Sequence, residues 1–206
     1  GKAREKGRQA VCISNLKQLT ISFFMYSQDN DDYLPPAYYY NSEGETGWDF
    51  STDDWWMTYR PGILGGYLSG KVFECPSRFG LKSYDRPFTG YAYNATYLGG
   101  GYSVWDGQAQ PPVLLTRIRN ASGTILLADS AIWTPFTNEL IANNVLRAPG
   151  DTSYYYGPNV YFRHNGFANA AFCDGHVESI RTKYNESSYD SKLGDLSADD
   201  SMYDLE

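Results

Sequence analysis

Histidine and the common catalytic motifs are scarce in this 206-residue sequence. It has two histidines, His164 and His176, and both lie in one short segment. There is no His-Glu-x-x-His zinc-protease motif, no Gly-x-Ser-x-Gly nucleophile motif and no Gly-x-x-x-x-Gly-Lys-Ser/Thr phosphate loop. The glycine triplet at 99–101 lacks the lysine and helix of a phosphate loop, so a flexible turn is expected there. These absences favour a protein that is not an enzyme.

Long apolar segments are missing as well. No run of about 18 apolar residues and no signal-peptide pattern occurs, so this chain taken alone is expected to be soluble. Residues 1–8 carry four basic side chains and one acidic side chain, with almost nothing to bury. Such an end either projects into solvent or continues a segment that this sequence does not include.

Positive charge is in the minority. Lys and Arg total 17 against 24 Asp and Glu, a formal net charge of −7. An acidic chain argues against nucleic acid as a partner, because nucleic-acid binding needs a basic surface. The length fits one domain, which we place at residues 1–185. The acidic segment 186–206 has few large apolar residues, and we expect a surface-draped or disordered tail there.

One long amphipathic helix is predicted over residues 2–30. The segment contains no proline and a single glycine. Apolar residues recur at helical spacing and define one buried face. This face comprises Cys12, Leu16, Leu19, Phe23 and Tyr26, and is widened by Ile13, Thr20 and Phe24. The polar run at 28–32 and the Pro35-Pro36 pair end the helix. At about 1.5 Å per residue it would extend roughly 40 Å.

A β-hairpin is predicted near the C-terminal end. Residues 168–173 form a strand of small side chains, Asp174-Gly175 forms a two-residue turn, and 176–181 form the returning strand. An Asp-Gly pair between strand-like runs is a strong hairpin signal, because both turn positions need positive φ.

The remaining chain is expected to hold short elements and loops. Loops are expected at 33–50 and 102–112, a short helix capped at 51–54 and continuing through 55–59, strands or extended segments at 72–75, 91–98, 124–128 and 154–163, and an insertion at 131–153. The continuous apolar run at 124–128 is typical of a central buried strand. The predicted fold class is therefore α+β, with the long helix packed on an antiparallel sheet.

The three cysteines leave their pairing open. Cys12 lies on the buried face of the predicted helix, and Cys75 precedes Pro76 in an extended segment. They could form a disulfide in an oxidising compartment, or remain two buried thiols. Cys173 lies in the small-residue strand and is expected to be a packed thiol without a bond.

The C-terminal histidines suggest a possible metal site. His164, Asp174 and His176 could converge on a cation across the hairpin. The simpler interpretation is structural. Asp174 would hydrogen-bond its own turn, Gly175 would supply the turn conformation, and His164 would brace the hairpin through a backbone carbonyl. We favour the structural interpretation.

Aromatic residues are frequent, with 19 Tyr, 10 Phe and 5 Trp. Aromatic faces beside polar side chains suit sugars or protein partners. Candidate ligand-facing aromatics are Tyr38, Tyr39, Trp48, Trp105 and Tyr155. The alternative is that these side chains fill the core, which we favour for Trp55 and Trp56.

Several sequence blocks resemble a known family. In chain order they are residues 2–9, 12–19, 25–31, 72–77, 90–94 and 125–130, followed by His164, nine residues, and Asp174-Gly175. Together they resemble the prepilin-like, type II secretion pseudopilin-related family with a C-terminal H-X9-DG motif, of the kind found in Planctomycetes and Lentisphaerae. The prepilin cleavage site and apolar half-helix of that family are not present in this sequence.

The resemblance implies a spine helix with a sheet-bearing head, no catalysis and no cofactor. It implies an extracytoplasmic protein, in the periplasm or at the cell surface, anchored in the inner membrane by a preceding segment. Its partners would be other pilin-like subunits through the helix. The alternative function, suggested by the aromatic residues, is an extracytoplasmic binding module that presents aromatic loops to a polysaccharide or an exported client.

The resemblance also raises calcium, because related major pseudopilins bind it in a C-terminal loop. Candidate oxygen ligands follow the helix at Asp29, Asp31 and Asp32, or lie in the tail at Asp195, Asp199 and Asp200. A polar helix terminator is the simpler interpretation of the first group.

Overall fold

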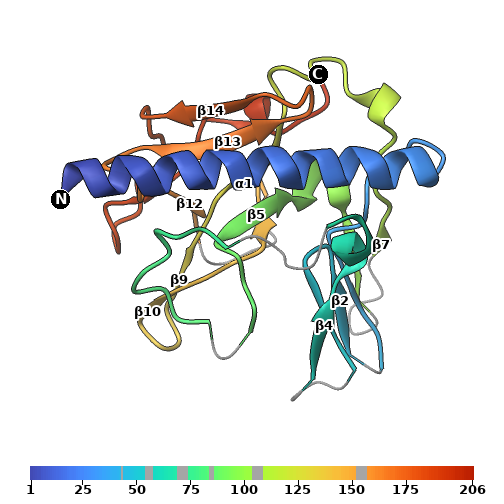
Figure 1. The fold of residues 1–206 in the computed structure, drawn as a ribbon, viewed down its shortest axis with the longest axis horizontal. Helices are drawn as coiled ribbons and strands as arrows, with labels where there is room; N and C mark the ends of the chain where they lie inside the picture. Colours follow the sequence, from blue (N-terminus) through green and yellow to red (C-terminus); the bar gives the residue numbers. More distant parts are fainter. Residues whose placement is uncertain (43, 54–57, 69–73, 84–85, 104–108, 152–156) are drawn as a thin grey trace.

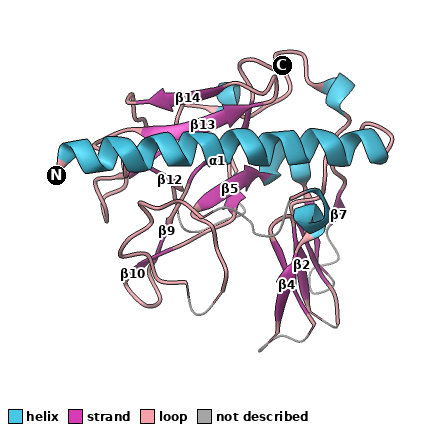
Figure 2. Cartoon of the chain, in the orientation of Figure 1, coloured by secondary structure: helices cyan, strands magenta, loops and turns pink. Residues whose placement is uncertain are grey.

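The computed structural model describes residues 1–206 except 43, 54–57, 69–73, 84–85, 104–108 and 152–156. The fold is α+β, with one long N-terminal helix lying across a central sheet and a second sheet beside it (Figures 1 and 2). In the part of the chain that is described, no helix is both long and apolar enough to cross a bilayer.

The predicted helix is confirmed as α1, Lys2–Asp29. Its fully buried apolar side chains are Cys12, Leu16, Leu19 and Phe23, which lie on the predicted face. Asn30 ends the helix, and Asp31 and Asp32 follow with positive φ angles of 51° and 62°. These left-handed residues turn the chain sharply back toward the body of the protein.

The central sheet has five strands in the order β11-β5-β8-β13-β14. Their bounds are β5 Tyr91–Asn94, β8 Ile125–Asp129, β11 Val145–Leu146, β13 Ala168–Phe172 and β14 Val177–Ile180. The predicted central strand is confirmed, because β8 lies in the middle and all five of its residues are buried. Both faces of the sheet carry an apolar core, which explains an apolar run without alternation.

The two faces are covered by opposite ends of the chain. Helix α1 lies across β13 on one face (Figure 1), where Leu16 and Phe23 belong to the larger core. The other core includes Leu196 and Tyr203 from the C-terminal segment. There β15, Leu193–Gly194, pairs with β12, Val160–Tyr161, and the 3-10 turn η4 spans Asp200–Met202.

The expected surface-draped or disordered tail is therefore wrong for its central part. Leu193, Leu196 and Tyr203 are at most 2% exposed. These few apolar residues, spaced among acidic ones, suffice to pack the segment onto the sheet because each one is completely buried.

A second sheet contains six short strands in the order β4-β3-β2-β1-β6-β7. Their bounds are β1 Tyr38–Tyr40, β2 Glu45–Gly47, β3 Phe50–Thr52, β4 Tyr59–Pro61, β6 Gly101–Ser103 and β7 Ala109–Gln110. The predicted loops at 33–50 and 102–112 are wrong, since both contribute strands. Ser51 and Thr52 lie in β3 rather than capping a helix, and Tyr59 lies in β4, while 54–57 are outside the described residues. Pro61 is tolerated because β4 is an edge strand.

Three other segments differ from expectation. The predicted strand at 91–98 ends at Asn94 and continues as one π-helical turn, η2 Ala95–Gly99. The expected insertion at 131–153 contains a hairpin of β9, Ile132–Thr134, and β10, Glu139–Ile141, followed by β11, which pairs in parallel with β5. Of the predicted strand at 154–163, the described residues show only β12. Two further 3-10 turns, η1 Ile63–Tyr67 and η3 Leu115–Arg117, complete the helical elements of the described residues.

The C-terminal hairpin is confirmed, but its turn differs from the two-residue prediction. Gly175 N–H donates to Phe172 O, and Phe172 N–H donates to His176 O. Gly175 has a φ of 97°, whereas Asp174 does not have a positive φ. This is a three-residue loop closed by a left-handed glycine.

Candidate functional site

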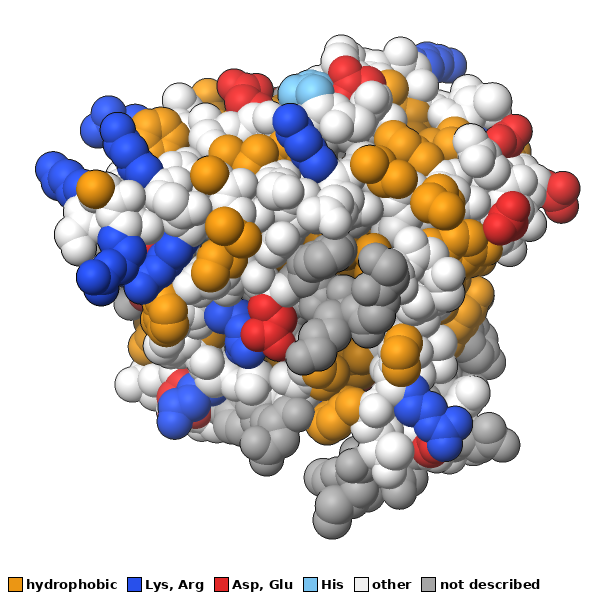
Figure 3. Space-filling model, in the orientation of Figure 1, with side chains coloured by type: hydrophobic (Ala, Val, Ile, Leu, Met, Phe, Trp, Pro, Cys, Tyr) orange, Lys and Arg blue, Asp and Glu red, His pale blue; other side chains and the backbone are white. Residues whose placement is uncertain are grey.

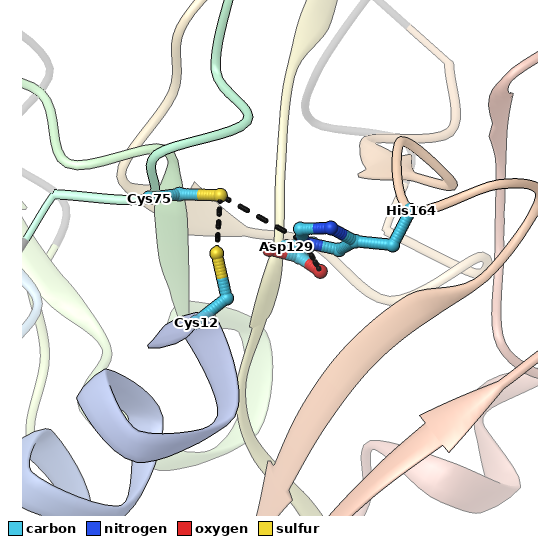
Figure 4. A group of neighbouring side chains, drawn as sticks. All are labelled: Cys12, Cys75, Asp129 and His164. Carbon is cyan, nitrogen blue, oxygen red and sulfur yellow. Dashed lines mark hydrogen bonds and ion pairs between the residues drawn. The ribbon is translucent and has the colours of Figure 1, made fainter. Parts of the chain in front are cut away.

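Four buried side chains from distant parts of the chain meet on one side of the central sheet (Figure 4). Cys12 comes from α1, Cys75 from the loop before β5, Asp129 from the end of β8, and His164 from the turn after β12. One ligand atom of each lies within 4.8 Å of the others, and each side chain is at most 1% exposed. We call these four residues the buried cluster.

Contacts within the buried cluster are short. The Sγ atoms of Cys12 and Cys75 are 2.7 Å apart, and Cys75 Sγ is 3.8 Å from His164 Nε2. The same nitrogen is 3.2 Å from Asp129 Oδ2. The cluster therefore consists of a thiol pair placed against an imidazole–carboxylate pair.

Local sequence explains how each side chain arrives there. Cys12 lies one helical turn before Leu16 on the buried face of α1, and Asp129 directly follows the apolar run of β8. His164 precedes Asn165-Gly166, whose φ angles of 53° and 87° form a tight turn closed by reciprocal backbone bonds between His164 and Phe167. Asn-Gly is the strongest signal for such a turn, and this signal could have located His164 from the sequence.

A second layer of polar groups holds the imidazole–carboxylate pair. His164 Nδ1 is 2.8 Å from Glu5 Oε1, and Ser77 Oγ donates to the same oxygen at 2.6 Å. Asn169 N–H donates to Asp129 Oδ2 at 2.7 Å. The Arg163 guanidinium lies beside Asp129, with Nε 3.9 Å from Oδ1.

The charges in this network balance. Burial disfavours a charged imidazole, but hydrogen bonds to Asp129 and Cys75 and the negative charge of Asp129 outweigh it and raise the pKa of His164 to about 10. Partial burial acts to raise the pKa of Glu5, yet hydrogen bonds from Ser77 and His164 hold it below its usual value. At neutral pH His164 is thus an imidazolium that donates to two carboxylates.

The thiols are in a different electrostatic state. Burial raises the pKa of the Cys75 thiol far above its usual value, and contact with Cys12 raises it further. The Cys12 and Cys75 thiols are both shielded from solvent. A dissolved molecule could reach them only if α1 moved away from the sheet. The arrangement can form a disulfide, or it can offer two sulfurs, one nitrogen and one oxygen to a zinc ion.

The predicted convergence of His164, Asp174 and His176 is wrong. Asp174 Oδ1 accepts the His176 backbone N–H at 3.0 Å and lies 2.6 Å from His176 Nδ1, and both side chains are exposed. The hairpin turn and His164 lie beside different parts of α1. A Cβ on Gly175 would lie 3.5 Å from Phe24, whereas His164 contacts Glu5. Phe24 and Glu5 are nineteen residues apart on the helix, which corresponds to roughly 28 Å along its axis. Asp174 and Gly175 instead build the hairpin turn, as the structural interpretation held.

The predicted role of His164 is also wrong in its detail. A brace through a backbone carbonyl was expected, but the ring nitrogens face the carboxylates of Glu5 and Asp129. Sequence spacing did not suggest this contact because the two acids lie 159 and 35 residues away along the chain.

The candidate calcium ligands serve protein contacts. Asp195 accepts from Asn185 Nδ2, Asp199 caps η4 through Ser201 N–H, and Asp200 accepts from Tyr97 and from Gly150 N–H. Burial raises the pKa of Asp195 to about 6. Asp31 and Asp32 form the turn after α1, and Asp29 interacts with Tyr67. Among the described residues, the buried cluster is the one group of potential ligands that converges.

The candidate aromatics separate into buried and exposed groups. Trp48 is completely buried and donates to Asn144 O, so it belongs to the core rather than to a ligand surface. Tyr38 is partly buried against Tyr40, whereas Tyr39 is 41% exposed. Trp105 and Tyr155, together with Trp55 and Trp56, lie outside the described residues.

All three cysteines are buried and carry free thiols. Cys12 and Cys75 are both buried thiols in direct contact, so the structure brings together the pair that the sequence left open. Cys173 is a buried thiol in the hairpin, as expected.

Comparison with known proteins adds no relative. No protein-family model matches the sequence, and neither a curated protein nor a solved structure matches it.

Proposed function

We propose that this chain is a non-enzymatic, pseudopilin-like assembly subunit, in which α1 is the spine through which subunits pack and the sheets form the head. The proposal rests on the sequence resemblance described above and on one structural observation. Helix α1 keeps a regular solvent-exposed seam along its entire length, opposite the face that packs on the sheet.

The seam follows a three–four spacing, the pattern by which one helix packs against another. Its members are Arg4, Gly7, Val11, Ser14, Gln18, Ile21 and Met25, and all seven are exposed. Val11, Ile21 and Met25 are among the most exposed large apolar residues of the protein, at 49%, 56% and 46%. Packing against a second helix would remove these side chains from water, which would favour association along the seam.

The surface around the seam fits a packing site for similar helices. Figure 3 views the face along which α1 runs and shows separate apolar patches among polar atoms, with Lys and Arg gathered near the N-terminal end. Gly7 and Ser14 let another helix approach closely, and a Cβ at Gly7 would meet nothing within 4 Å.

The body holds the helix rigidly behind this seam. Gln9 Nε2 donates to Ser179 Oγ at 3.1 Å, and Asn15 Nδ2 donates to Glu74 O at 3.0 Å. Phe23 packs edge-on against Tyr93, with ring centroids 4.6 Å apart. In the proposed assembly the subunit is extracytoplasmic and is anchored in the inner membrane by a segment that precedes α1, and its head faces an exported client or polysaccharide.

Cysteine cross-linking in membranes tests the proposal on the full-length native protein. Gln18→Cys places a thiol on the seam, and Thr137→Cys is the control at the exposed β9–β10 turn. The native cysteines are buried in both variants. We expect oxidation to give cross-linked dimers for Gln18→Cys and none for Thr137→Cys. A full-length protein that fractionates as a soluble monomer would refute the proposal.

A second candidate function is favoured by the face of the second sheet. Tyr39, Thr46, Ser51 and Arg60 are paired in register across four strands, so their side chains share one face. An open polar pocket of about 370 Å³ lies there, lined by Asn41, Thr46, Ser51, Thr52 and Asp53. An exposed tyrosine beside hydroxyl and carboxylate groups is suited to a sugar.

Fluorescence titration with oligosaccharides tests this candidate. Binding that is lost in Tyr39→Ala, and retained in Tyr184→Ala on another exposed surface, would support a polysaccharide site. No response across a broad oligosaccharide panel would exclude it while leaving the assembly proposal intact.

A further inference from the structure

We infer that Cys12 and Cys75 are joined by a disulfide in the mature protein, and that this bond clips the N-terminal half of α1 to the loop before β5. The inference is independent of the proposed assembly function. It rests on the sulfur spacing, on the contacts that hold the two backbones together, and on the state of the neighbouring groups.

The sulfur atoms are already close to bonding distance. They lie 2.7 Å apart, against about 2.05 Å in a disulfide. Two thiolates bound at about 2.3 Å to one tetrahedral zinc would lie roughly 3.8 Å apart. Forming the disulfide requires a smaller movement than opening the pair around a metal.

Contacts other than the sulfurs already bring the two segments together. Asn15 Nδ2 donates to Glu74 O at 3.0 Å, next to Cys75, and Ser77 Oγ donates to Glu5 at 2.6 Å. The Arg8 guanidinium lies over the Phe79 ring, 4.7 Å from its centre. These contacts on both sides of the cysteines fix the loop on the helix, so a disulfide would form without pulling either backbone out of place.

The remaining members of the buried cluster are engaged without a metal. The His164 imidazolium is shared between Asp129 and Glu5, and Asp129 also accepts the Asn169 N–H. Zinc would require His164 to lose a proton and both thiols to ionise. A disulfide removes two neutral thiols and therefore no charge; His164 Nε2 loses its contact with the Cys75 thiol and keeps Asp129 as its partner.

The reaction is a thiol–disulfide exchange with an external disulfide, such as that of a thiol oxidoreductase. A thiolate of the pair attacks the external disulfide and releases one thiol, and the second cysteine then attacks the mixed disulfide and releases the other. Cys12 and Cys75 together lose two protons and two electrons, and the external disulfide is reduced to two thiols. Because the pair is buried afterwards, exchange takes place before α1 docks fully, and the finished bond is protected from reductants.

The third cysteine cannot replace either member in the folded protein. Cys173 lies two residues before Gly175, which is beside Phe24 of α1. Cys12 precedes Phe24 by twelve residues, which is roughly 18 Å along the helix axis. The inference therefore specifies one pair.

Thiol counting and mass spectrometry on the full chain test the inference. After refolding in a glutathione redox buffer, we expect one reactive thiol per chain in guanidinium, at Cys173, and a mass lower by two hydrogen atoms. Proteolytic mapping should recover Cys12 linked to Cys75. Reduction of the unaltered protein should yield three reactive thiols and lower the Tm by about 10 °C. The control variant Cys173→Ser should still form the Cys12–Cys75 disulfide.

Two outcomes would overturn the inference. Three reactive thiols after oxidative refolding would show that the pair remains reduced. Three thiols with one zinc per chain by elemental analysis would show that the buried cluster is a metal site instead. Both measurements use the unaltered protein, so they do not depend on whether Cys12→Ser or Cys75→Ser folds.

Discussion

Two buried ionisable residues, His164 and Asp49, affect the stability of this protein and its dependence on pH. His164 is an imidazolium at neutral pH because Asp129 and Glu5 flank it, and its removal would leave buried Asp129 with the Asn169 N–H as its donor and the Arg163 guanidinium, 3.9 Å away, as the remaining cation. Asp49 presents the opposite case, since its side chain is buried, forms no ion pair with any residue that the structure describes, and has an Oδ2 atom without a hydrogen-bond partner there.

The first residue-scale prediction concerns His164. His164→Gln should lower the free energy of unfolding at pH 7 by about 3–5 kcal/mol, because a buried charge loses its partner. Urea unfolding measures this effect. His176→Gln is the control, and it should change stability by less than about 0.5 kcal/mol because that side chain is exposed.

The pH dependence of the same site follows from its pKa. A folded-state pKa raised from 6.5 to about 10 means that the stabilisation by His164 is complete below about pH 6.5 and is lost as pH rises toward 10. In the reduced protein, which keeps the Cys75 thiol that helps to raise this pKa, stability measured from pH 6 to 10 should therefore decline, and it should decline less in reduced His164→Gln. Equal slopes in the two proteins would contradict the assigned charge state.

For Asp49, replacing the buried ionisable side chain should increase the stability of the fold rather than decrease it. Burial raises the pKa of Asp49 to about 7, although an Asn144 hydrogen bond acts to lower it. A carboxyl with a raised pKa destabilises the fold as pH rises from about 4 to 7. Asp49→Asn keeps the oxygen that accepts from Asn144 and should raise stability at pH 8 by roughly 1–3 kcal/mol. Thermal unfolding at pH 4.5 and 8 measures the difference, and an equal effect at both pH values would contradict it.

At the scale of elements, α1 has two apolar surfaces, one buried against the sheet and one exposed to solvent. Leu19 is completely buried against the sheet, and Ile21, two residues on, is 56% exposed on the seam. Leu19→Ala should lower the free energy of unfolding by about 2–5 kcal/mol, and Ile21→Ala by less than about 0.5 kcal/mol. Chemical unfolding of both variants checks this, and a large loss for Ile21→Ala would mean that the seam serves the fold rather than assembly.

Elements with strong periodicity were predictable from the sequence, and short ones were not. The stripe from Cys12 to Phe23 gave the correct buried face of α1, and the apolar run of β8 indicated a central strand. The second sheet was missed because its strands have two or three residues each, too few to show alternation. Its order also depends on a parallel pairing between Tyr39 and Tyr102, far apart in the chain.

Two of the four residues in the buried cluster, the two cysteines, were predictable as neighbours from local sequence patterns. Cys12 and Cys75 were identified as a possible pair from the helix stripe and the proline after Cys75. Nothing local connects Asp129 or Glu5 to His164, because their contact exists only after β8, the turn at 165–166 and α1 have assembled. The Asn165-Gly166 turn signal was available and would have placed His164 at a chain reversal.

At the scale of the whole molecule, the C-terminal segment completes the fold. Tyr203 is fully buried, and its carbonyl accepts from Asn94 Nδ2 at 2.7 Å. Tyr203→Ala should lower the free energy of unfolding by about 3–5 kcal/mol. Tyr189→Ala, 64% exposed, is the control and should have a much smaller effect in the same urea titration. Equal effects would mean that the segment packs only loosely.

The central sheet is covered on one face by α1 and on the other by the segment with Leu196 and Tyr203, which lie on either side of its strands in the chain. Strands β5, β8 and β13 all precede Leu196 and Tyr203 in the chain, so the face that these two residues cover stays open until the segment that carries them has been made and has left the ribosome. Contacts of such long sequence separation form slowly. Until Tyr203 has left the ribosome, the nascent chain therefore presents an uncovered apolar sheet face, and it is in this interval that it most needs protection by a chaperone.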